Sequence, residues 1–322
     1  MQTVRTHALP ESPDSGAVYI LLPQEESLSL YPERTDRNIG WITPEEQQML
    51  RSLTVGIAGC GGMGGLVAST LLRLGIGHIK IADNEIFDVS NLNRQFAANK
   101  GTLGKSKAFE TAKMLRQITD DSAISVYPMG INEESVADFV SGCDVICDEI
   151  EFWALGSRML LHAHAREQKI PLFNSPTVGH RVYVYLYTHD SMTIEKVVGM
   201  TYEEAKLLQS KIAQRSATPD QIRHLMEVML RFAAPEIPEY TAKESSYSTV
   251  KALRDRLFEQ TTASIIATNP PMASGMLANQ VLFKLLEKSG IERCFVKVIP
   301  MPGYLMFDAG LMECKVCDAV WW

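Results

Sequence analysis

A group of glycines stands where a phosphate could be bound. They are Gly59, Gly61, Gly62 and Gly64, in the string G-C-G-G-M-G that follows a short apolar run. Glycines at this spacing allow a tight turn and a close approach of the backbone to a phosphate, and the helix expected next offers unpaired N–H groups. Asp83 lies 19 residues after Gly64, where a carboxylate in such a fold accepts hydrogen bonds from ribose hydroxyls. Together these residues predict a nucleotide site.

Polar and cationic residues further along the chain distinguish between two nucleotides. Asn91 and Arg94 lie in the block S-N-L-N-R-Q, and Lys107 follows in G-K-S-K-A. A triphosphate needs such cations beyond the glycine turn, because its extra negative charge has to be held and oriented. The glycines and Asp83 alone would equally suit the NAD of an oxidoreductase, but that alternative leaves Arg94 and Lys107 unexplained. The combination favours ATP.

In order and spacing, these motifs resemble the ThiF/MoeB/HesA family of adenylyltransferases, a branch of the ubiquitin-activating-enzyme superfamily. The resemblance covers roughly residues 37–187, and more faintly residues 270–286. It implies ATP-dependent adenylation of a carboxylate, which gives acyl-AMP and pyrophosphate. A carboxylate is already ionised near pH 7, so this reaction needs no general base.

The resemblance also implies roles for single residues. It implies that Asp83 binds the ribose of ATP, Asn91 and Arg94 bind phosphates, and Lys107 binds the β- and γ-phosphates. Arg37 resembles the family arginine that reaches across a dimer interface into the partner's phosphate site, which implies a homodimer with composite active sites. We expect Lys107 to be exposed, so that replacing it would weaken ATP use far more than folding.

The magnesium position departs from the family pattern. The family has D-x-x-D at the end of this strand, whereas the chain has C-D-E-I-E, which places Glu151 in the Mg²⁺ position and Asp148 one turn earlier. A glutamate reaches one CH₂ further than an aspartate, so either the backbone compensates or Asp148 shares the duty. This departure keeps open a third interpretation, a non-catalytic scaffold subunit of an activating-enzyme heterodimer.

The acid that would be activated is not identified by the sequence. Candidates are the C-terminus of a small ubiquitin-like carrier protein and a side chain or terminus of a precursor peptide. The chain has no cysteine between Cys147 and Cys294, so we expect no thioester on a loop cysteine. Arg181 follows N-S-P-T-V-G-H at an expected sheet edge and is a candidate substrate contact. Cys314 and Cys317 supply only half of a tetrahedral zinc site, and zinc is not expected.

The pattern of elements places these residues on a Rossmann-like fold. Strands are predicted at residues 54–58, 78–82, 124–127, 145–147, 171–174, 182–187, 295–299 and 304–307. Helices are predicted at residues 66–74, 103–118, 136–140, 153–168 and 272–286, with more between 202 and 257. This alternation predicts an α/β, doubly wound, mostly parallel sheet with helices on both faces and a helical insertion.

Four regions are expected along the chain. They are an N-terminal arm and capping helix (1–50), an ATP-binding adenylation core (51–190), a helical insertion that could cover the substrate (191–262), and a C-terminal helix and strands that complete the core (263–322).

Composition excludes several classes of protein. With 46% hydrophobic and 21% charged residues the chain resembles soluble globular proteins. It has no apolar run near the ~18 residues that span a bilayer and no secretory signal, so we expect a cytoplasmic protein without a membrane partner. A net charge of −7 without a long basic run predicts no nucleic-acid partner.

Overall fold

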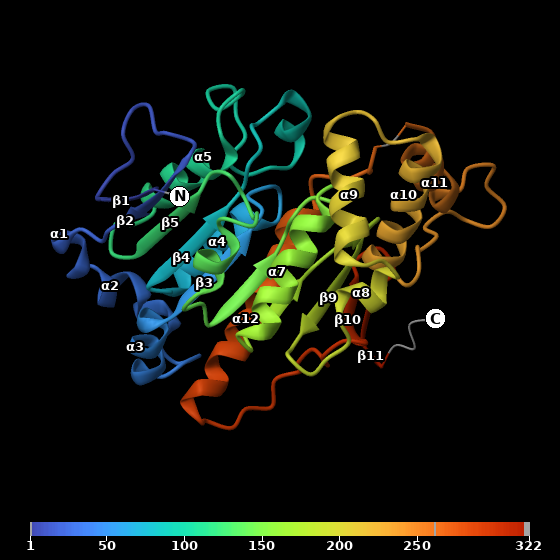
Figure 1. The fold of residues 1–322 in the computed structure, drawn as a ribbon. Coiled ribbons are helices and arrows are strands. Elements are labelled where there is room, and N and C mark those ends of the chain that lie inside the picture. The colour runs from blue at the N-terminus through green and yellow to red at the C-terminus, as the bar shows by residue number, and fades with distance from the viewer. Residues whose placement is uncertain (1, 261, 319–322) are drawn as a thin grey trace.

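A mixed β-sheet with helices on both faces forms the centre of the molecule (Figure 1). The computed structural model describes residues 2–260 and 262–318. The strands are β1 (Gln2–Thr6), β2 (Ala17–Leu21), β3 (Thr54–Ala58), β4 (His78–Ala82), β5 (Ala123–Tyr127), β6 (Val145–Asp148), β7 (Leu172–Asn174), β8 (Thr177–Val178), β9 (Arg181–Tyr187), β10 (Gly303–Asp308) and β11 (Glu313–Asp318).

Helices connect and cover these strands. The α-helices are α1 (Glu25–Leu28), α2 (Tyr31–Thr35), α3 (Pro44–Ser52), α4 (Gly64–Leu74), α5 (Lys107–Arg116), α6 (Val136–Val140), α7 (Leu155–Glu167), α8 (Ile194–Val198), α9 (Tyr202–Ala213), α10 (Pro219–Ala233), α11 (Thr249–Gln260) and α12 (Asn269–Leu286). Three short 3₁₀ helices are η1 (Asp36–Asn38), η2 (Val89–Asn93) and η3 (Glu287–Ser289).

The strand order places a ligand crevice between β3 and β6. The order is β1-β2-β5-β4-β3-β6-β7-β9-β10-β11, with β8 paired to β9. The five strands from β5 to β7 are parallel, whereas β2, β9, β10 and β11 each join an inner neighbour in antiparallel fashion. The chain moves outward from β3 to β4 and β5, then returns to add β6 on the other side. Ligands bind at such a switch point, beyond the carboxyl ends of the strands.

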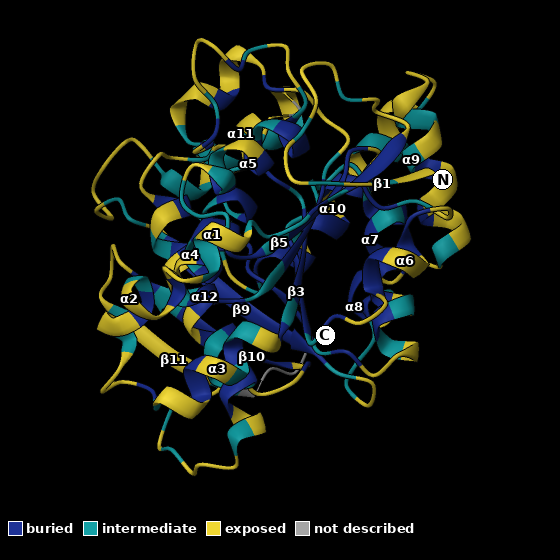
Figure 2. Ribbon diagram, turned by 90° about the vertical axis from the view of Figure 1, so that its left-hand side faces the viewer, coloured by how far each residue is buried: buried dark blue, intermediate teal, exposed yellow. Residues whose placement is uncertain are grey.

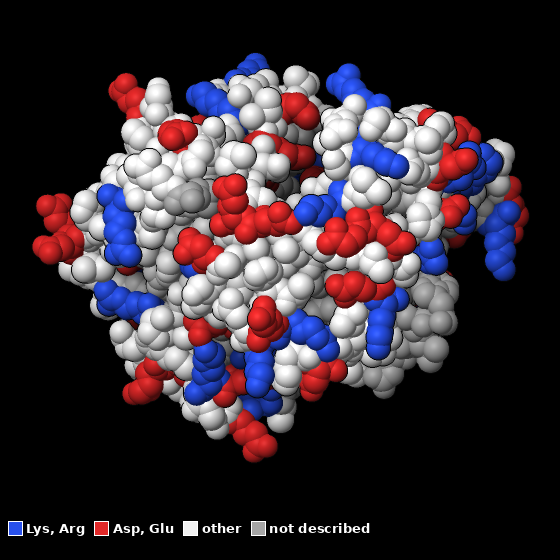
Figure 3. All heavy atoms as spheres, viewed as in Figure 1, with Lys and Arg blue, Asp and Glu red and all other residues white. Residues whose placement is uncertain are grey.

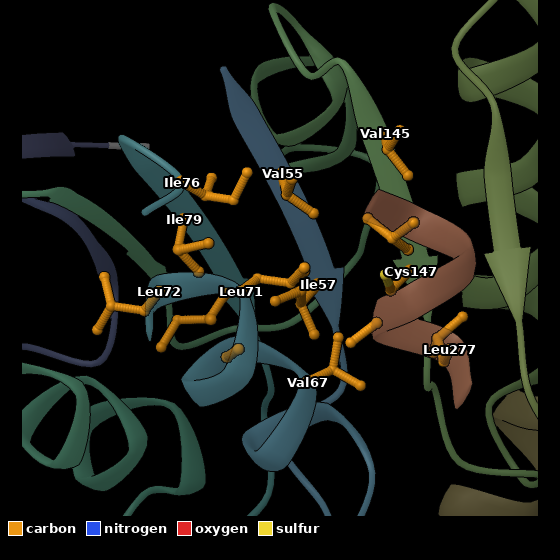
Figure 4. Packing of buried hydrophobic residues seen from close by; sticks show 14 of the residues in the cluster. Val55, Ile57, Val67, Leu71, Leu72, Ile76, Ile79, Val145, Cys147 and Leu277 are labelled. Carbon is orange, nitrogen blue, oxygen red and sulfur yellow. The ribbon is translucent and has the colours of Figure 1, made fainter. Parts of the chain in front are cut away.

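Side chains of the inner strands alternate between two hydrophobic cores. Val145 and Cys147 of β6 face the core that contains α4 and α12, whereas Ile146 faces the core that contains α6 and α7. Figure 4 shows β3 and β6 side chains packed between Leu71 of α4 and Leu277 of α12. Figure 2 shows the strands buried and the outer faces of the helices exposed. The prediction of a doubly wound, mostly parallel sheet is therefore confirmed.

The N-terminal region contains more regular structure than an arm. β1 and β2 extend the sheet beyond β5, and Tyr19 and Leu21 of β2 are buried in the core. The predicted helix start after them is present: Thr43 caps α3, with Glu46 completing the capping box. The predicted helices of the insertion are also present as α8 to α11.

Two predicted elements differ in the structure. The strand predicted at residues 295–299 is wrong, because this segment pairs with a side chain: Gln280 donates to Val296 O at 3.0 Å and accepts from Val298 N at 3.2 Å. The helix predicted from residue 103 begins only at Lys107, since Gly104 has φ +77° and Ser106 provides the N-cap. Among the described residues, no helix is long and apolar enough to cross a membrane.

Replacing Leu71 with alanine is expected to lower the free energy of unfolding by about 2–5 kcal/mol, because a fully buried leucine would leave a cavity between α4 and the sheet. Chemical denaturation measures this loss. Leu207→Ala is the control, since Leu207 is 57% exposed and should change stability by less than about 0.5 kcal/mol. Equal losses in the two variants would contradict the packing described.

Candidate active site

Two positions in the turn after β3 have room only for glycine. Gly59 has φ +104°, and a Cβ there would lie 2.1 Å from Glu149 O. A Cβ on Gly64 would lie 1.8 Å from Gly59 O. The turn therefore packs against its own backbone and against the loop after β6, as a close phosphate-binding turn requires.

The N-terminus of α4 is open to an anion. Met63 occupies the N-cap position and makes no side-chain capping bond. Gly61 and Gly62 precede it and line the surface of the crevice. Uncapped N–H groups and the positive end of an 11-residue helix favour a phosphate at this place.

Asp83 lies at the carboxyl end of β4, beside the glycine turn. Its carboxylate accepts hydrogen bonds from Cys60 N at 2.7 Å and Glu85 N at 2.8 Å. Burial raises the pKa of Asp83 to about 6, although the Cys60 bond and the charge of Lys107 act in the opposite direction. The carboxylate is thus oriented by the backbone and is ionised at neutral pH.

Lys107, the first residue of α5, is buried at 2% exposure and not exposed as expected from the sequence. Its ammonium group lies 2.5 Å from Glu85 Oε2. Burial alone would lower the pKa of Lys107, but the hydrogen bond to Glu85 and the charge of Asp83 leave it above its ordinary value. A charged ammonium therefore faces the crevice, and the Glu85 side chain that pairs with it is itself 47% exposed.

These groups enclose a cavity of about 550 Å³, lined among others by Gly59, Gly61, Asp83, Lys107 and Glu151. Figure 3 shows a hollow on this face of the molecule, with acidic and basic side chains beside it. The structure thus brings together the predicted glycines, the predicted ribose ligand and one predicted phosphate ligand.

The segment that carries Asn91 and Arg94 lies over the glycine turn. Asn91 is buried and accepts a hydrogen bond from Asp88 N at 3.1 Å, which holds η2 in place. Arg94 Nη1 donates to Ser90 O at 3.0 Å, and the side chain lines a second cavity next to Gly62. The arrangement places Arg94 beside the open end of α4.

The two carboxylates considered for magnesium have different surroundings. Glu151 lies near the glycine turn, where its Oε1 would be 4.0 Å from a Cβ on Gly61. Asp148 is fully buried, 2.8 Å from Arg158 Nε and 2.9 Å from His162 Nε2. Burial alone would raise the pKa of Asp148, but Arg158 and His162 hold it below its ordinary value. Within residues 2–260 and 262–318, no three His, Cys, Asp or Glu side chains converge in a metal-binding cluster.

Arg37 and Arg181 lie apart from these groups. Arg37 is exposed on η1 and lines neither cavity of its own chain. Arg181 is buried, with its Nε 2.8 Å from Asp308 and its Nη1 3.3 Å from Glu236. It therefore ties the loop between α10 and α11 to β10, and it does not line the crevice.

The second cavity is larger, about 1400 Å³ including its open mouth, and shares Gly61 and Glu151 with the first. Five of its lining residues have buried side-chain atoms without a hydrogen-bond partner among the described residues. The atoms are Gln95 Oε1, Glu149 Oε1, Arg158 Nη1, Asn174 Oδ1 and Ser175 Oγ. Buried polar groups are nearly always paired, so this concentration indicates a ligand site. No motif in the sequence marked these residues, although N-S-P did end a predicted strand.

Comparison with known proteins identifies the family to which the chain belongs. The model of the ThiF family matches residues 35–309, and the chain belongs to this family. It is 33% identical over 147 residues to the mouse adenylyltransferase and sulfurtransferase MOCS3, covering 45% of this chain and 31% of that protein. It is 30% identical over 136 residues to the Escherichia coli tRNA threonylcarbamoyladenosine dehydratase, covering 42% of this chain and 50% of that protein. The aligned part thus spans half or less of these relatives.

The fold has counterparts among solved structures. The crystal structure of E. coli MccB with ATP superposes with a TM-score of 0.56 at 16% identity, covering 84% of this chain and 65% of that chain. The similarity supports the same Rossmann-like architecture, extended well beyond the segment that sequence identity covers.

If Asp83 is the ribose ligand, adenosine binding is expected to weaken about tenfold between roughly pH 7.5 and pH 5, because the Asp83 carboxylate, with its pKa of about 6, becomes protonated and can no longer accept both ribose hydroxyls. Calorimetry with adenosine avoids titration of phosphates. Asp83→Asn should bind more weakly and without this pH dependence. A wild-type affinity that is flat across this range would exclude Asp83 as the ribose ligand.

Proposed function

We propose that the protein is an ATP- and Mg²⁺-dependent adenylyltransferase that activates a carboxylate. The observation that carries the proposal is the junction of two cavities at Gly61 and Glu151. One cavity contains Asp83 and Lys107, and the other contains the unpaired buried polar atoms. A nucleotide and an acid bound in them would meet at this wall. The name of the mouse relative and the ATP in the MccB structure support the same reaction.

The residues present fit a triphosphate better than NAD. Asp83 would accept the ribose hydroxyls, and the α4 N–H groups would bind a phosphate. Lys107 would exchange its half-exposed partner Glu85 for β- and γ-phosphate oxygens, and Arg94 and Asn91 would act from the segment above. Such a set of donors neutralises the charge that develops as pyrophosphate leaves.

Magnesium fits Glu151 as its protein ligand. Mg²⁺ is commonly held by one or two carboxylates together with substrate phosphates, and it neutralises phosphate charge. Glu151 lines both cavities, whereas Asp148 is paired with Arg158 and His162. We therefore assign Glu151 to the metal and give Asp148 a supporting role, in which it fixes the loop that carries Glu151.

The chemical step needs position and charge neutralisation from the chain. An oxygen of the ionised acid attacks the α-phosphorus, the bond between the α-phosphorus and its bridging oxygen breaks, and pyrophosphate departs with the electron pair. The acid would come from a small carrier protein or a precursor peptide, and no loop cysteine would take over the acyl group. The protein would act as a homodimer in the cytoplasm, in which Arg37 of one copy reaches the phosphates bound by the other. Arg181 would stabilise the part of the site that binds the acid.

Pyrophosphate exchange tests the proposal directly. Labelled pyrophosphate should enter ATP only when Mg²⁺ and a suitable carboxylate are present. ATP binding without exchange for any acid would indicate a scaffold subunit, and binding of NAD in place of ATP would indicate an oxidoreductase.

Lys107→Met is expected to slow this exchange on the order of 100-fold, because the leaving pyrophosphate loses a preorganised cation. Lys105→Met is the matched control, since Lys105 is exposed two residues earlier and should retain activity. Melting temperatures are measured alongside, because Lys107 is buried. A loss of exchange that merely parallels unfolding would remove Lys107 from the mechanism.

Glu151→Gln is expected to raise the Mg²⁺ concentration needed for half-maximal exchange by roughly tenfold or more, because a neutral amide binds Mg²⁺ more weakly than a carboxylate. Glu134→Gln, at an exposed position, should leave the Mg²⁺ titration unchanged. An unchanged titration in Glu151→Gln would refute the assignment of the metal ligand.

A further inference from the structure

The larger cavity is apolar over most of the part that the insertion covers, although Arg254 of α11 also lies in its lining. A face of α10 contributes Leu225, Met226, Met229 and Leu230, which recur at helical spacing. Leu257 of α11 adds to the same wall. This wall offers no side-chain hydrogen-bond donor or acceptor from these five residues, apart from weakly accepting methionine sulfurs. The insertion therefore presents a hydrophobic surface to whatever enters.

Polar groups lie at the opposite end, next to the nucleotide cavity. Gly61 and Glu151 line both spaces, so the two lie side by side. Arg158 adds a buried Nη1 without a partner among the described residues, and its guanidinium lies 4.8 Å from the centre of the Phe232 ring. A ligand in this cavity would thus have an anionic or polar end near the nucleotide and an apolar end under α10.

The lining of the cavity decides what the far end of the ligand is. Leucines and methionines of α10 and α11 form the wall that lies away from the polar groups. Resting on the proposed adenylation, we propose that the reacting carboxyl group is attached to an apolar group that occupies the space between α10 and α11. The two methionines suit this role, because flexible thioether side chains adapt to apolar groups of different shape.

Selection follows from the cost of burying polar atoms. A polar group under α10 would lose water without gaining a partner from the leucines and methionines, whereas an apolar group of the same size would gain by leaving water. The cavity therefore favours a leucine-like acid over an asparagine-like acid, although the two have nearly the same shape.

Exchange with matched acids tests this inference. N-acetyl-leucine, N-acetylasparagine and N-acetylglycine differ in the group next to the carboxylate. We expect kcat/KM for N-acetyl-leucine to exceed the other two by about 10- to 100-fold. Acetyl-Ala-Ala-Leu distinguishes the two sources of such an acid: a further increase would indicate a peptide end, and a decrease a small free acid. Equal use of leucine and asparagine acids overturns the inference.

Variants of the apolar wall test whether it causes the preference for the leucine acid. Leu230→Gln and Leu257→Gln, both at half-buried positions, should reduce the preference for leucine over asparagine toward one. Leu207→Gln in α9 is the matched control, because Leu207 is exposed and lies outside the cavity. The preference should persist in this control. A preference that persists in the two wall variants places the apolar group elsewhere and overturns the inference.

Binding measurements separate failure of the inference from failure of adenylation. Trp153 lines the cavity, so its fluorescence reports an occupant, and Trp153→Phe identifies its share of the signal. If no acid supports pyrophosphate exchange, the proposed adenylation is refuted. Binding of the acids alone then tests whether the cavity is an apolar site. N-acetyl-leucine that binds more tightly than N-acetylasparagine, and more weakly to Leu257→Gln, supports the apolar site. Equal binding of both, or binding of neither, overturns it.

Discussion

The contact between two backbone turns at the carboxyl edge of the sheet determines where everything else lies. Gly59 leaves β3 with φ +104°, and any Cβ on it would meet the carbonyl oxygen of Glu149 at 2.1 Å. Because β3 and β6 are neighbours at the switch point, the loop after β6 is held directly against the phosphate-binding turn. Glu151 therefore borders both cavities, and in the proposed reaction the acid would approach the nucleotide along this seam. Neither the crevice nor the order of its ligands would survive a side chain at Gly59.

Two ionic arrangements beside this seam differ in how firmly they are fixed. Asp148 and Arg158 are both enclosed by protein, and breaking such a pair leaves an uncompensated buried charge, so it acts as a permanent support. Lys107 is buried too, but its partner Glu85 is half-exposed and can turn into water at little cost. The second pair thus stores a charged ammonium in position until an anion of greater charge replaces the carboxylate. The buried pair resists change, whereas the half-exposed pair permits exchange.

Local patterns in the sequence were sufficient to predict the inner strands and the glycine turn, but not the elements and contacts around them. Alternating β-branched runs, the glycine turn and Asp83 predict the inner strands and the ribose ligand, because their spacing is set within one strand-turn-helix unit. β1 and β2 escaped prediction, since prolines and polar residues surround them and their stability comes from the pairing of β2 with β5 and of β1 with β2. The segment at 295–299 has a strand-like sequence, but Gln280 satisfies its backbone in place of a neighbouring strand. The burial of Lys107 and the unpaired Nη1 of Arg158 depend on contacts between distant segments, which no local motif records.

The helical insertion leaves the sheet after β9 and returns at α12, so α8 to α11 form one uninterrupted stretch of chain. The nucleotide half of the site contains none of these helices except through Gln209 of α9, which lines the smaller cavity. Replacement of this one stretch can therefore alter which acid is accepted while the phosphate turn, β4 and α5 stay as they are. The apolar wall and the nucleotide cavity are thus encoded by separate stretches of one polypeptide, so the sequence of the first can vary without changing the second.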